Sequence, residues 1–116
     1  GAAFALILVH STALARSPST SNDYINGCKD FVRLATPKNF REAAYAGRCA
    51  GAIESILRVG SILKGDARFC LPEGVTVMQG VKVVVKFMDD RPAALNQDFT
   101  TLAVVAFATA WPCSTK

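Results

Sequence analysis

Four cysteines restrict the folds open to this chain more than any other feature of its sequence. They are Cys28, Cys49, Cys70 and Cys113. An even number of cysteines in a small exported domain predicts a disulfide framework, whereas the same residues in a reducing compartment indicate a metal site or free thiols. The first question is therefore whether the chain is exported.

The N-terminal residues indicate that it is. Residues 1–15, GAAFALILVHSTALA, are apolar from Ala2 to Val9, then turn small and polar, and end in Ala-Leu-Ala. This order is typical of the hydrophobic region and cleavage site of a secretory signal peptide. A transmembrane anchor needs about 20 apolar residues, and the stretch HST interrupts this run far earlier. We expect a signal-peptide remnant over 1–15 and one mature domain over 16–116, starting near Arg16 and without a membrane span.

A single metal site is the alternative use of the cysteines. Closed zinc sites usually take ligands in close pairs such as CxxC, and no two cysteines here are so close. The only histidine, His10, falls within the predicted signal peptide. We therefore predict two disulfides, and neither a metal nor another cofactor.

The charged residues argue against one class of partner. The chain has 13 Lys and Arg against 9 Asp and Glu, a net charge of +4. The basic residues are scattered singly and are not interleaved with aromatic residues, so the sequence does not indicate nucleic-acid binding. A mildly basic surface favours an acidic protein partner or an anionic envelope surface, although it can also serve solubility alone.

The mature chain shows four segments with helical periodicity and no hairpin signal, which predicts an all-α fold. The helices are expected over about 21–34, 40–63, 77–89 and 99–111. A run of valines in the third segment could indicate a strand, but the capping box formed by Thr76 and Gln79, together with the flanking lysines, favours a helix. The other helices have caps at Ser21 or a neighbour, Thr36 or Asn39, and Asn96 or Asp98.

Two helices carry further expectations. The second contains Gly47 and Gly51, and each glycine costs about 1 kcal/mol inside a helix. Close approach by a neighbouring helix would compensate, or the weakness is simply tolerated. The last helix is apolar nearly all round, so we expect it to be the most buried.

The positions of the cysteines on these helices predict their pairing. Cys28 and Cys49 lie mid-helix on the first two helices, so one bridge would clamp that pair. Cys70 precedes the third helix and Cys113 follows the fourth, so a second bridge would tie both ends of the second pair together. We therefore predict Cys28–Cys49 and Cys70–Cys113, one of three possible connectivities.

No catalytic constellation is present in the mature chain. Without a histidine, it lacks the Ser-His and Cys-His pairs of nucleophilic catalysis. No GxSxG, GxGxxG or GxxxxGK motif occurs. We expect no enzymatic activity and no catalytic residues.

The C-terminal half of the chain has a distinctive pattern: Cys-x-Pro-x-x-Val-Thr, a Gln, an aliphatic helix, a Pro, an Ala- and Leu-rich helix, and Trp-Pro-Cys. The residues that form it are Cys70, Pro72, Val75, Thr76, Gln79, Pro92, Leu102, Ala106, Trp111, Pro112 and Cys113. In this pattern the chain resembles the Rap/Tai family of periplasmic immunity proteins of type VI secretion systems. Upstream, Cys28 and Cys49-Ala50-Gly51 also match, so the resemblance runs from about residue 22 to 113.

This resemblance implies a compact helical domain that is periplasmic and able to form a homodimer. It also implies a protein that binds a peptidoglycan amidase toxin and occludes the toxin's active-site cleft. The alternative is a periplasmic acid-stress chaperone (holdase) or another envelope binding module. Such chaperones are usually richer in acidic residues, so the excess of basic residues argues mildly against that function.

Loops or exposed helix ends should carry the contacts with a partner, because the helices are committed to the core. The first candidate segment is Lys64–Glu73, in which Arg68 and Phe69 form a basic and aromatic pair. The second is Asp89–Asp98, with Asp89, Asp90 and Arg91 at its start. Arginine and aromatic residues are favoured at binding hot spots, but Phe69 fits the core equally well.

Overall fold

The computed structural model describes residues 19–114 and confirms the predicted all-α fold in that part of the chain. Its four helices are α1 (Ser21–Val32), α2 (Phe40–Val59), α3 (Val77–Asp89) and α4 (Phe99–Ala110). Three short 3-10 turns lie between them, namely η2 (Gly60–Ile62), η3 (Gly65–Ala67) and η4 (Pro92–Ala94). The predicted signal peptide falls outside the described residues.

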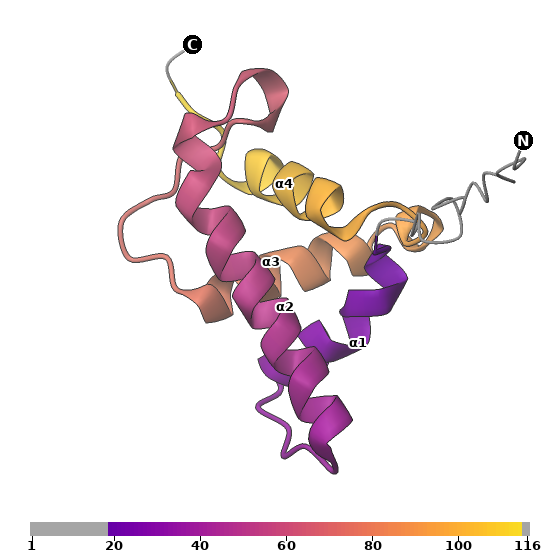
Figure 1. The fold of residues 1–116 in the computed structure, drawn as a ribbon. Helices are drawn as coiled ribbons and strands as arrows, with labels where there is room; N and C mark the ends of the chain where they lie inside the picture. Colours follow the sequence, from indigo (N-terminus) through magenta and orange to yellow (C-terminus); the bar gives the residue numbers. More distant parts are fainter. Residues whose placement is uncertain (1–18, 115–116) are drawn as a thin grey trace, which may run out of the picture.

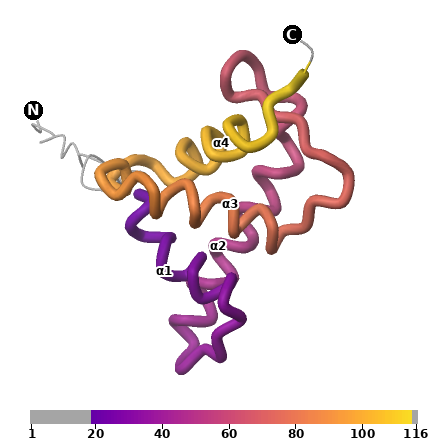
Figure 2. Tube along the Cα trace, turned by 180° about the vertical axis from the view of Figure 1, so that it is seen from behind, coloured from indigo at the N-terminus to yellow at the C-terminus, as the bar shows by residue number. Residues whose placement is uncertain are grey.

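The helices form two pairs that cross each other (Figure 1). α1 and α2 make a hairpin whose connecting loop is one extremity of the molecule, and α3 packs across both of them. α4 lies against α3, at the opposite end from the α1–α2 loop (Figure 2). None of the described helices combines the length and the apolar character that crossing a bilayer would require.

Polar caps begin each helix, broadly as the sequence predicts. Asn39 and Asp98 accept hydrogen bonds from the free backbone N–H groups of α2 and α4. Thr76 does the same for α3, with 3.1 Å between its Oγ1 and the Gln79 nitrogen. The predicted capping box is only half formed, however, because the Gln79 side chain lines a surface groove instead of returning to the backbone of Thr76.

The first helix is capped by Thr20 rather than Ser21. Ser21 is fully buried, and its backbone N–H and its hydroxyl both donate to the carbonyl of Gln97, at 2.8 and 3.1 Å. The Phe99 N–H in turn donates to the Ser19 carbonyl at 3.0 Å. The start of the domain is thus held by the segment that leads into α4.

The core lies where the two helix pairs cross. Its largest fully buried side chains come from the loop after η3 and from α2, α3 and α4, namely Phe69, Phe99, Phe107, Ile53, Met88, Val81 and Val84. α4 contributes more buried residues than any other helix, as predicted. Its outer flank nevertheless stays open, with Val105 43% exposed.

Both predicted disulfides are present. Cys28–Cys49 joins the middle of α1 to the middle of α2 with a Cα–Cα distance of 5.3 Å, and both residues are fully buried. Cys70–Cys113 joins the loop before α3 to the segment after α4, and both residues are only half-buried. Beside this second bridge, the Cys70 N–H donates to the Trp111 carbonyl at 2.9 Å.

Of the two alternatives for the glycines of α2, the structure favours tolerated weakness, and a close helix approach occurs at a glycine of α1 instead. A Cβ added to Gly27 would lie 2.4 Å from the carbonyl oxygen of Tyr45 on α2, whereas nothing lies within 4 Å of one added to Gly47 or Gly51. Gly27 therefore lets the two helices approach beside their disulfide, and the glycines of α2 are open.

Because Gly27 is tightly packed and Gly47 is open, alanine should change the free energy of unfolding in opposite directions at these two positions. Gly27→Ala should lower the free energy of unfolding by about 1–3 kcal/mol, because its methyl group meets a backbone oxygen that cannot rotate away. Gly47→Ala should raise it by up to about 1 kcal/mol, because alanine is the better helix former and the space is free. Denaturant unfolding of the two variants measures both values, and effects of the same sign would contradict the packing.

The two disulfides should also differ in their rate of reduction. Thiol–disulfide exchange needs access for the attacking thiolate, so limited reduction followed by alkylation should label Cys70 and Cys113 first. Mass spectrometry of the peptides identifies the labelled residues. Labelling of Cys28 and Cys49 at the same rate would show that exposure does not control reduction here.

Candidate functional site

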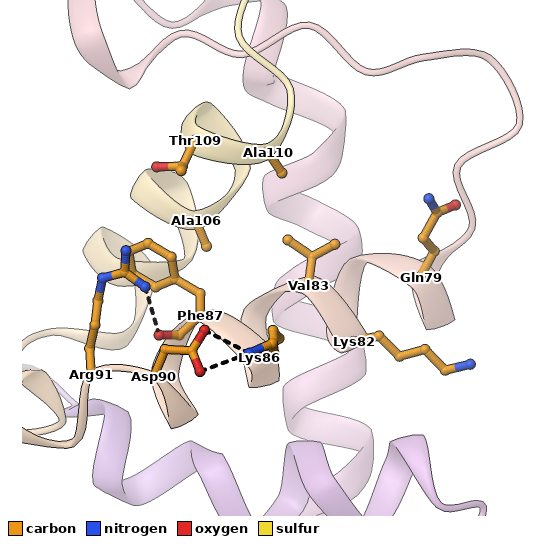
Figure 3. A pocket seen from close by; sticks show the side chains of 10 residues that line it. All are labelled: Gln79, Lys82, Val83, Lys86, Phe87, Asp90, Arg91, Ala106, Thr109 and Ala110. Atoms are coloured by element: carbon orange, nitrogen blue, oxygen red, sulfur yellow. Dashed lines mark hydrogen bonds and ion pairs between the residues drawn. The ribbon is translucent and has the colours of Figure 1, made fainter.

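A surface groove of about 460 Å³ runs between α3 and α4 (Figure 3). We call it the α3/α4 groove. Its apolar wall consists of Val83 and Phe87 from α3 and Ala106 and Ala110 from α4, and its polar lining consists of Gln79, Lys82, Lys86, Asp90, Arg91 and Thr109. The groove is thus an apolar surface flanked by charged side chains.

The spacing of apolar residues on α3 explains why this surface exists. Val81, Val84 and Met88 face the core and are fully buried. Val83 and Phe87, four residues apart, form a second apolar stripe that the rest of the fold covers only in part. On α4, the small side chains of Ala106 and Ala110 leave room beside that stripe.

Arg91 closes one end of the groove. It follows the C-cap of α3 and folds back over the helix, so that its guanidinium carbon lies 3.7 Å from the centre of the Phe87 ring. The same guanidinium donates to the Phe87 carbonyl at 3.2 Å. A cation over an exposed aromatic face contributes about 0.5–1 kcal/mol, so the Arg91 side chain is held in place but remains on the surface.

The charged lining of the groove is predominantly positive. It has three basic side chains, Lys82, Lys86 and Arg91, against the single carboxylate of Asp90. Lys86 and Asp90 form an ion pair with 2.8 Å between Nζ and Oδ1. Because Lys82 has no ion pair within the described residues, the rim has unpaired positive charge to offer to a carboxylate.

The groups that line the groove are suited to binding. All four cysteines are in disulfides, and no group of three or more His, Cys, Asp or Glu that could hold a metal ion occurs between residues 19 and 114. The groove offers apolar surface, an aromatic ring and cations. These groups can bind an apolar segment that carries a carboxylate.

The structure separates the five residues predicted to contact a partner. Asp90 and Arg91 line the groove, and Asp89 turns toward α1, where it pairs with Lys29 at 3.0 Å. Arg68 is half-buried and donates from Nε to the Ser61 carbonyl at 3.2 Å. Arg68 and Phe69 belong to the loop at the far end of α4, so they do not form one surface with the other three (Figure 1).

Of the two positions that the sequence allows for Phe69, partner contact or core, the structure shows the core, because Phe69 is fully buried. Its ring lies 5.3 Å from that of Phe107, and a Cβ on Gly60 would meet it at 2.2 Å. Phe69 is therefore a core residue and not a contact for a partner. The sequence alone does not decide between the two, because only tertiary packing brings Gly60 opposite the ring.

Sequence reasoning missed Phe87, the aromatic ring of the groove. From the sequence, no function was assigned to Phe87. Phe87 stands four residues after Val83, a spacing that places both on one helix face, and Arg91 follows four residues later, just beyond the C-cap of α3. That spacing was available in the sequence as a signal.

A comparison with protein families gives one match. The model of the family described as Rap1a immunity proteins matches residues 20–113. The match spans all four helices and all four cysteines. No curated protein and no solved structure matches the chain significantly.

Arg91 lies on the surface and Phe69 lies in the core, so replacing each residue by alanine should change the stability of the protein by different amounts. Arg91→Ala should lower the free energy of unfolding by less than about 1 kcal/mol, since it removes only an exposed cation–aromatic contact. Phe69→Ala should lower it by about 3–5 kcal/mol, since it leaves a cavity in the core. Similar losses in denaturant unfolding would mean that the assignment of these two side chains is incorrect.

Proposed function

The chain belongs to the Rap1a immunity protein family, and from this membership we propose that it is a periplasmic protein that blocks a peptidoglycan amidase toxin of a type VI secretion system. As an immunity protein it has a secreted toxin as its partner. The proposal adds the class of toxin and the mode of action, which is steric occlusion of the toxin's active-site cleft without catalysis by the immunity protein. The family match over residues 20–113 is the observation that carries the proposal.

The α3/α4 groove is the surface that we assign to the toxin. Its wall offers an aromatic ring and a partly exposed apolar stripe, and Arg91 is fixed over that ring. Aromatic residues and arginine dominate the energy of many protein interfaces. Because hydrogen bonds and packing already hold these side chains, little conformational entropy is lost when a partner binds.

The rim of the groove favours a toxin segment with acidic residues. Lys82 is exposed and unpaired within the described residues, and Lys86 and Arg91 lie along the same side of α3. Opposite charges on the partner would speed association and fix its orientation. The toxin segment in the groove should thus combine an apolar side chain with neighbouring carboxylates.

Two sequence features support the periplasm as the location. The predicted signal peptide over 1–15 would export the domain, and an oxidising compartment would maintain the two disulfides. Homodimer formation, which the family resemblance implies, stays a prediction.

The function can be tested with purified components. The mature protein is mixed with a candidate type VI peptidoglycan amidase, and release of cleaved peptidoglycan is measured. We expect stoichiometric loss of cleavage. No effect on the amidase, together with acid-dependent suppression of client aggregation, would favour the chaperone function instead.

Two changes in the groove should weaken inhibition of the toxin without unfolding the protein. Ala110→Arg fills the groove with a long side chain beside Phe87, and Arg91→Glu reverses a positive charge on its rim. Each should weaken toxin binding about tenfold or more, as measured by calorimetry. Ala44→Arg, an exposed alanine on α2, is the matched control and should bind as the parent does. A control that loses as much affinity as Ala110→Arg would remove the groove from the proposal.

A further inference from the structure

The loop between α1 and α2 and the first turn of α2 carry two large apolar side chains that the fold does not use. We call residues 33–41 the hairpin tip. Leu34 is 77% exposed and Phe40 is 87% exposed, and neither packs against the core. The hairpin tip is the extremity of the α1–α2 hairpin in both views (Figures 1 and 2), so these side chains project where another surface can reach them.

Local structure gives no reason for a leucine at position 34. Its φ is +52°, a left-handed conformation in which glycine or asparagine is usual and a leucine is strained. The position therefore combines an unfavourable backbone with an exposed apolar side chain. Folding alone would favour a polar or smaller residue, so the leucine has another use.

The hairpin tip is ordered by its own hydrogen bonds. The Ala35 N–H donates to the Asp30 carbonyl at 3.1 Å. The Lys38 N–H donates to the Glu42 carboxylate at 2.8 Å, and the Glu42 N–H donates to the Asn39 side chain at 2.9 Å. Leu34 and Phe40 are thus presented on a prearranged loop, which loses little conformational entropy when it binds.

The charges of the hairpin tip are positive. Residues 33–41 contain Arg33, Lys38 and Arg41 and no acidic residue. The nearest carboxylates are already occupied, since Asp30 pairs with Arg33 and Glu42 accepts the hydrogen bond from the backbone of Lys38. Lys38 and Arg41 have no ion pair within the described residues. Their charge is therefore available to an external anion.

We propose that the hairpin tip docks on the surface of an anionic phospholipid bilayer. Such a surface has phosphates for Lys38 and Arg41, and beneath them an apolar layer for Leu34 and Phe40. A protein partner would need a concave pocket of matching shape, whereas a bilayer accepts a convex tip without one. The net charge of +4 adds attraction toward the same surface.

This role is separate from toxin binding and does not depend on it. The α3/α4 groove lies on the helix pair at the other end of the molecule (Figure 2). A domain docked through the hairpin tip would therefore keep the groove free. The inference adds a membrane surface to the partners of this protein.

Vesicle flotation tests the proposal directly. The probe is vesicles of equal parts phosphatidylethanolamine and phosphatidylglycerol, compared with vesicles of phosphatidylcholine alone. The protein is the chain from Arg16, which keeps the whole described core and both disulfides and omits the apolar segment before it. We expect binding to the anionic vesicles only, and its release at high salt, because salt screens exposed charges.

Matched variants assign the binding to the hairpin tip. Phe40→Ser should weaken vesicle binding about tenfold or more, while Ile62→Ser, which alters a side chain that is 74% exposed near the other end of α2, should leave it unchanged. Lys38→Gln combined with Arg41→Gln should weaken it about fivefold per residue. The control is Lys64→Gln combined with Lys82→Gln, which removes two positive charges outside the hairpin tip. This control should bind the anionic vesicles more tightly than the variant with Lys38→Gln and Arg41→Gln, although both variants have the same net charge. Denaturant unfolding checks that each variant is folded.

Three results would overturn the proposal. The first is equal binding of the parent protein to neutral and anionic vesicles. The second is an equal loss for Ile62→Ser and Phe40→Ser, which would indicate general adhesiveness. The third is unchanged vesicle binding of Phe40→Ser combined with lost protection against the toxin, which would assign the hairpin tip to a protein partner.

Discussion

The buried Cys28–Cys49 bridge is the constraint around which the domain is built. Both residues are completely enclosed by the core, and Gly27 beside the bridge lets α1 come against the backbone of α2. The hairpin fixed in this way presents Ile53 to α3, which crosses α2 at a glycine of its own. A Cβ on Gly80 would lie 3.1 Å from Ile53. The position of α3, and hence one wall of the groove, follows from the joined hairpin.

Aromatic contacts then connect the second helix pair to the first. Tyr24 of α1 stacks on Phe99 at the start of α4, with 4.0 Å between ring centres. At the other end of α4, Phe107 contacts both Phe69 and Trp111. These contacts fix α4 at both ends. Thr109 and Ala110, on the side of α4 beside α3, remain exposed and are available to a partner. The surface that we assign to the toxin thus lies largely outside the folding core of the same two helices.

Most of the scaffold could be predicted from the sequence, because its signals are local. Helical periodicity and the cap at Thr76 depend on residues that are neighbours in the chain, and the pairing of the cysteines follows from their positions on the predicted helices. The positions of Phe69 and Gly27 could not be predicted in this way, because each depends on a residue brought near by tertiary packing, namely Gly60 and Tyr45. The groove depends on the distance between α3 and α4. Only Asp90 and Arg91 of the predicted contacts lie in it.

The hydrogen bonds between Ser21 and Gln97 join residues 76 positions apart, and this has a consequence for how the domain acquires its structure. A chain that crosses a membrane from its N-terminus emerges with α1 first and the segment before α4 almost last. The N-terminal end of α1 can then be completed only after nearly the whole domain has emerged, and contacts of such long range slow folding. During that interval Cys28 and Cys49 are the only cysteines that have both emerged until Cys70 follows. For a domain exported as we propose, the order of emergence would therefore favour formation of the Cys28–Cys49 bridge before the competing pairings become available.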